Sequence, residues 1–63
     1  MLDYQNRVVE EKKALDEKID KLMMFVESGR METVNDAEKS RLRIQLHIMD
    51  AYSTCLGERI ANF

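Results

Sequence analysis

The chain lacks proline and tryptophan, and it has only two glycines and one cysteine among 63 residues. Without proline nothing forces a break in a helix, and the many Glu, Lys, Leu, Met, Ala and Arg residues favour an all-α protein. The single cysteine, Cys55, excludes a disulfide within the chain and suits a reducing, cytosolic setting. His47, the one histidine, does not stand at zinc-ligand spacing from Cys55. We therefore expect no metal and no cofactor.

An excess of basic charge and a long apolar run are also missing. The net charge is −2, 35% of the residues are charged, and both signs are mixed along the chain. Such a balance suits solvated helices and makes nucleic-acid binding an unfavoured function. No apolar run approaches the ~20 residues of a membrane span, and no signal-peptide pattern opens the chain. We expect a cytoplasmic protein that does not enter a membrane.

Catalytic motifs are absent as well. The sequence has no glycine-rich phosphate loop and no set of Ser, His and Asp residues arranged for nucleophilic catalysis. The acidic residues fall on positions that should face solvent. The sequence therefore predicts a binding or structural protein rather than an enzyme.

A first helix is expected over residues 2–28, with one apolar stripe. The stripe consists of Tyr4, Val8, Leu15, Ile19, Leu22 and Val26. Lys12 stands in its one missing position, and we expect the lysine to lay its stem along the helix contact with its ammonium in water, with contact to a ligand as the alternative. Gly29 is the expected left-handed residue that ends the helix. Residues 29–34 then form a loop in which Met31 and Val34 fold back over the open end.

A second helix is expected over residues 35–61, with two apolar stripes. Asn35 is the expected N-cap, with Thr33 as the alternative, and Glu38 has the spacing to reach back and complete a capping box. The first stripe, here called the core stripe, consists of Leu42, Leu46, Met49, Leu56, Ile60 and Phe63, with Ser53 in its gap. The second stripe, on roughly the opposite side, consists of Ala37, Ile44, Ile48, Ala51 and Cys55.

The two helices match in length and phase, which predicts a single-domain antiparallel two-helix hairpin. Facing positions should have residue numbers that sum to about 68. A hairpin buries one side of each helix, so the second stripe has no partner within the chain. Because a domain this small is marginally stable alone, we expect it to self-associate into a helical bundle through the second stripe.

Two groups of side chains are candidate binding residues. Met24 and Phe25 form a candidate patch for a protein partner, with packing against the loop or a second subunit as the alternative. Tyr4, Arg7, Tyr52 and Arg59 are candidate ligand residues, since tyrosine rings stack and arginines clamp phosphate. For these four, edge packing and ion pairing with nearby glutamates are the alternatives. Gly57 in a helix interior costs ~1 kcal/mol, which indicates the close approach of a helix or a ligand at that level.

Several residues outside the apolar repeat carry a family resemblance. The matching segments are Tyr4-Gln5-x-Arg7-Val8-x-x-Glu11, Leu15-x-x-Lys18-x-x-x-Leu22, Arg41-Leu42-x-x-Gln45-Leu46-x-x-Met49-x-x-Tyr52 and Leu56-x-x-Arg59-Ile60. In these the chain resembles small crAss-phage-related proteins of bacteriophages and prophages. The resemblance implies a phage origin and action in the host bacterial cytoplasm, and it supplies no established activity.

Three functional hypotheses follow. The first is a non-enzymatic, homo-oligomeric phage protein that antagonises a host defence protein by binding it. The second is an oligomeric sponge that sequesters a cyclic nucleotide or oligonucleotide immune signal at subunit junctions. The third is a structural or assembly accessory protein. The first two rest on analogy with other small phage proteins.

Overall fold

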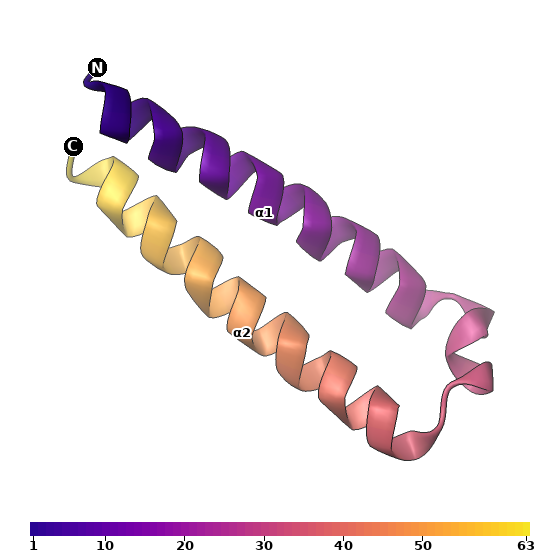
Figure 1. Cartoon of the computed structure of the whole chain (residues 1–63). Coiled ribbons are helices and arrows are strands. Elements are labelled where there is room, and N and C mark those ends of the chain that lie inside the picture. Colours follow the sequence, from indigo (N-terminus) through magenta and orange to yellow (C-terminus); the bar gives the residue numbers. More distant parts are fainter.

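The computed structural model describes all 63 residues as a helical hairpin (Figure 1). Its elements are α1 (Asp3–Glu27), the 3-10 helix η1 (Gly29–Thr33) and α2 (Asp36–Ala61). The long helices run antiparallel, both termini lie at one end, and η1 closes the other end (Figure 1). The molecule extends over 45 × 15 × 13 Å. The expected all-α hairpin is confirmed.

The end of α1 differs from the sequence-based expectation. No residue has a positive φ, so the prediction of a left-handed Gly29 is wrong. Instead Ser28 leaves the helix in an extended conformation. Its hydroxyl donates to the carbonyl of Phe25 at 2.7 Å and accepts from the backbone N–H of Arg30 at 3.3 Å. The hydroxyl of Ser28 thus gives a carbonyl at the helix end a hydrogen-bond partner, and Gly29 is free to begin η1.

At the start of α2, one of the two hydrogen bonds of the expected capping box forms. The side-chain oxygen of Asn35 accepts from the backbone N–H of Glu38 at 2.8 Å, which confirms Asn35 as the N-cap. The reciprocal bond from Glu38 does not form. Its carboxylate accepts from Nε of Arg41 at 3.2 Å instead, because that arginine lies one turn further along the same side of the helix.

The core lies between the two helices. Its buried cluster consists of Val8, Leu15, Ile19 and Leu56, with Leu46, Met49 and Ile60 packed against it. Met31 of η1 is also buried, as expected for a residue that folds back over the loop end. The edge contact between the rings of Tyr4 and Phe63 lies in the register expected from the sequence.

This core is small for a stable protein. Only six of the 63 residues are buried. All five residues of the second stripe are exposed, and Ile44 and Ile48 retain 57% and 62% of their accessible surface. Because a hairpin with so few buried side chains is marginal on its own, the open stripe is the main unsatisfied feature of the fold. Neither long helix combines the length and apolar character needed to cross a membrane.

Candidate functional site

The two candidate tyrosines lie at different levels of the hairpin. The ring of Tyr4 makes an edge-to-face contact with Phe63, with ring centroids 5.8 Å apart. Tyr52 is 46% exposed on α2. It precedes Phe63 by eleven positions, or roughly 16 Å along a helix axis. One chain therefore does not bring Tyr4 and Tyr52 into a common site, and a site that uses both needs a second chain.

The two candidate arginines have no acidic partner within the chain. Arg7 and Arg59 are both exposed. The ion pairs of the protein are Lys12–Asp16, Lys39–Asp36 and Arg41–Glu38, so neither arginine takes part in one. The ion pairing with nearby glutamates that was the alternative for these residues is not formed. Both guanidinium groups are available to an anion.

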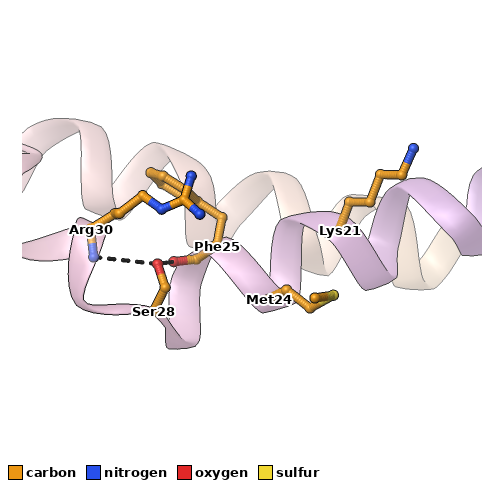
Figure 2. Close-up of a pocket in the computed structure, with 5 residues that line it drawn as sticks. All are labelled: Lys21, Met24, Phe25, Ser28 and Arg30. Carbon is orange, nitrogen blue, oxygen red and sulfur yellow. Dashed lines mark hydrogen bonds between the residues drawn. The ribbon is translucent and has the colours of Figure 1, made fainter.

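The candidate protein-binding patch lies at the loop end. Met24 is 70% exposed, whereas Phe25 is half-buried. Both line an open hollow of about 340 Å³ together with Lys21, Ser28 and Arg30 (Figure 2). Figure 2 shows the hydroxyl of Ser28 bonded to the backbone of Phe25 and of Arg30 beside these side chains. The hollow combines an apolar surface with two cationic side chains.

The structure also contains a polar cluster that the sequence analysis missed. Nζ of Lys12 donates to Oδ2 of Asp16 at 2.8 Å and to Oγ of Ser53 at 3.0 Å. The hydroxyl of Ser53 in turn donates to Asp16. The expectation that the ammonium of Lys12 extends into water is therefore wrong, because two acceptors lie within its reach. The available signal was that Lys12 and Ser53 are the polar interruptions of the two facing stripes.

Gly57 makes room for this cluster. A Cβ atom at Gly57 would lie 3.3 Å from Cε of Lys12, which is a tight contact. The close approach that the glycine indicated is thus explained by a side chain of the same protein. Lys12 belongs to α1, so the neighbouring helix accounts for the close approach and no ligand is needed.

Comparison with known proteins places the chain in a family. The Sequestin family matches residues 2–62, nearly the full length. The chain belongs to the Sequestin family. An uncharacterised 7.5 kDa protein from the denB–rIIB intergenic region of Enterobacteria phage T4 is 44% identical over 63 residues. That match covers 100% of this chain and 98% of the phage protein. No solved structure matches.

These matches confirm the expected relationship to small phage proteins. They do not concern the crAss-phage-related proteins, so that narrower resemblance stays a prediction. In this Sequestin-family protein, no group of three or more His, Cys, Asp or Glu side chains is placed to hold a metal ion. Its surface presents exposed arginines, exposed tyrosines and an exposed apolar stripe.

The Lys12–Asp16–Ser53 cluster predicts how stability depends on pH. The hydrogen bond from Lys12, followed by that from Ser53, lowers the pKa of Asp16 below its ordinary value. A lowered folded-state pKa stabilises the protein above the pKa of the unfolded chain, and this stabilisation is lost as pH falls through the folded-state pKa. The free energy of unfolding of the Asp16→Asn variant should therefore fall less between pH 7 and pH 2 than that of the wild type, as measured by urea denaturation.

Asp20→Asn is the matched control for this experiment. Asp20 is exposed on the same helix and belongs to no ion pair. Its replacement should leave the loss of unfolding free energy at low pH unchanged. An equal loss in the wild type and in the Asp16→Asn variant would show that the cluster does not couple protonation to folding.

Proposed function

We propose that this protein is a non-catalytic sequestering protein that self-associates and holds a cyclic nucleotide signal between its subunits. The observation that supports this proposal most directly is that Arg7 and Arg59 are exposed and have no acidic partner within the chain. The name of the Sequestin family also supports sequestration over catalysis. On these grounds the sponge hypothesis takes precedence over the protein antagonist that the sequence analysis placed first.

The proposed ligand follows from the chemistry of the candidate residues. Arginine binds phosphate through two parallel N–H donors, and tyrosine rings stack on a nucleobase. A cyclic nucleotide offers both groups in one compact molecule. Since Tyr4 and Tyr52 lie far apart in one chain, residues from two chains would enclose the ligand. We place this activity in the cytoplasm of the bacterial host.

Calorimetric titration and thermal melting with a panel of cyclic and linear nucleotides test this proposal. A ligand at 100 times its Kd stabilises the folded protein by ~2.7 kcal/mol, which raises the Tm by several degrees. Arg59→Ala should abolish the shift, because it removes the bidentate phosphate contact. Recovery of the intact nucleotide after denaturation of the complex would distinguish sequestration from hydrolysis.

Arg43→Ala is the matched control, since Arg43 is also an exposed arginine of α2 that forms no ion pair. It should keep the full shift. The sponge proposal fails if no nucleotide of the panel raises the Tm, or if both variants lose the shift to the same extent.

A protein target is the second candidate function, and the exposed Met24 beside the cationic hollow favours it. Methionine-rich surfaces adapt to partner helices. A host defence protein captured by the wild type, but not by Met24→Glu, would support this function. The third hypothesis, an assembly accessory, predicts neither nucleotide binding nor such a capture.

A further inference from the structure

The second stripe belongs to a longer regular pattern on α2. Arg41, Glu58 and Asn62 are all exposed and stand at its remaining positions. With them, the spacing alternates between four and three residues from Ala37 to Asn62. This is the seven-residue repeat by which one helix packs along another. The pattern has apolar residues in the middle and one charge of each sign toward its two ends.

We propose that this surface binds α2 of a second copy in antiparallel orientation, with the two-fold axis at the level of Met49 and Asp50. The proposal rests on the self-association in the proposed function and gives the geometry of one contact, between the second stripes of two copies. In this register Ile44 lies opposite Cys55 of the second copy, and Ile48 lies opposite Ala51 of the second copy. Each large side chain therefore meets a small one, which lets the two helices interdigitate.

The charges select the antiparallel orientation. Arg41 pairs with Glu38 at 3.2 Å within the chain, whereas Glu58 forms no ion pair. Antiparallel packing brings Arg41 of one copy opposite Glu58 of the other. Opposite charges then meet at both ends of the interface. Parallel packing would place every charge against its own copy, and such repulsion determines helix orientation.

The charges also select the register. A shift by one seven-residue repeat would place Arg41 opposite Ala51 of the second copy. Glu58 would then lie at the level of Val34, beyond the first residue of the partner's α2. The proposed register uses the full length of α2 and gives both charges a partner.

The single cysteine provides a direct test of this geometry. In the proposed dimer the two Cys55 residues are separated by roughly 16 Å along the helix axis. A disulfide needs Cα atoms within ~7 Å, so the oxidised wild type should stay non-covalent. Ile44→Cys places a thiol opposite the native Cys55 of the second copy. This variant should form a covalent dimer at least about tenfold faster than the wild type under mild oxidation, read on a non-reducing gel.

Each other result of the crosslinking experiment contradicts the proposal. Fast crosslinking of the wild type through Cys55 indicates parallel helices. Faster crosslinking of Ala37→Cys than of Ile44→Cys indicates the shifted register. Absence of crosslinking in all three proteins overturns the interface itself. If the wild type sediments as a monomer, the self-association in the proposed function is wrong. If it sediments as a dimer but forms a different crosslink, only the geometry proposed here is wrong.

A charge swap provides an independent measurement. Arg41→Glu and Glu58→Arg should each raise the dissociation constant of the dimer roughly tenfold, because each turns two symmetry-related attractions into repulsions. The double variant should restore most of the affinity. Arg41→Glu also removes the pair with Glu38 within the chain, and recovery in the double variant separates the two effects. Additive weakening in the double variant would overturn the proposal.

Discussion

Replacement of Leu56 by alanine is expected to remove most of the stability of the protein at 25 °C. Leu56 is only 1% exposed and packs in the cluster of Val8, Leu15 and Ile19. Loss of a buried leucine side chain costs about 2–5 kcal/mol. A single core of this size supplies no more than about 3–5 kcal/mol of net stability. One substitution should therefore remove nearly all of the stability of the folded chain.

Urea denaturation followed by circular dichroism, at one fixed protein concentration, measures this effect. Met24→Ala is the control, because Met24 is 70% exposed and its truncation should change stability by less than about 0.5 kcal/mol. A loss below about 1 kcal/mol for Leu56→Ala would mean that the contact between α1 and α2 is not the core that holds the chain together.

Replacement of Ile48 by glutamate is expected to dissociate the oligomer without disturbing the contact between α1 and α2 within each chain. Ile48 is 62% exposed in the single chain, so the hairpin has room for the new side chain. At an interface the same carboxylate would be buried without a partner, twice per dimer. The dissociation constant should rise by about a hundredfold or more, equivalent to about 2.7 kcal/mol. Sedimentation velocity over a concentration series measures the change.

Met24→Glu is the matched control for Ile48→Glu. It introduces the same side chain at a similarly exposed site off the second stripe, and it should leave the native mass unchanged. A wild type that sediments as a monomer at micromolar concentration and melts cooperatively would contradict the prediction. Equal masses for the wild type and the Ile48→Glu variant would place the interface elsewhere on the molecule.

Much of the fold follows from local patterns in the sequence. The apolar repeats predict two helices of nearly the observed extent and which side of each one packs inward, because helical periodicity depends only on residue spacing. The cap at Asn35 is equally local, since the acceptor and its donor are three residues apart. The exposure of Ile44 and Ile48 follows as well, because a helix that packs one stripe against its neighbour turns the opposite side to solvent.

For the candidate binding residues too, the sequence predicted some features and left others to the packed structure. Periodicity identified Arg7 and Arg59 as surface positions, but whether a glutamate pairs with them depends on side-chain placement that the repeat does not specify. The exit from α1 likewise depended on one hydroxyl group, that of Ser28, which made a left-handed Gly29 unnecessary.

Spacing along the chain therefore determined the helices, the hairpin and the open stripe of α2. Only the packed hairpin decided that Lys12 bonds to Ser53, a residue 41 positions away, and that Tyr4 lies against Phe63 far from Tyr52. The physical reason is that a repeat specifies the direction in which a side chain leaves its own helix. The atom that it meets depends on the height and rotation at which the second helix packs.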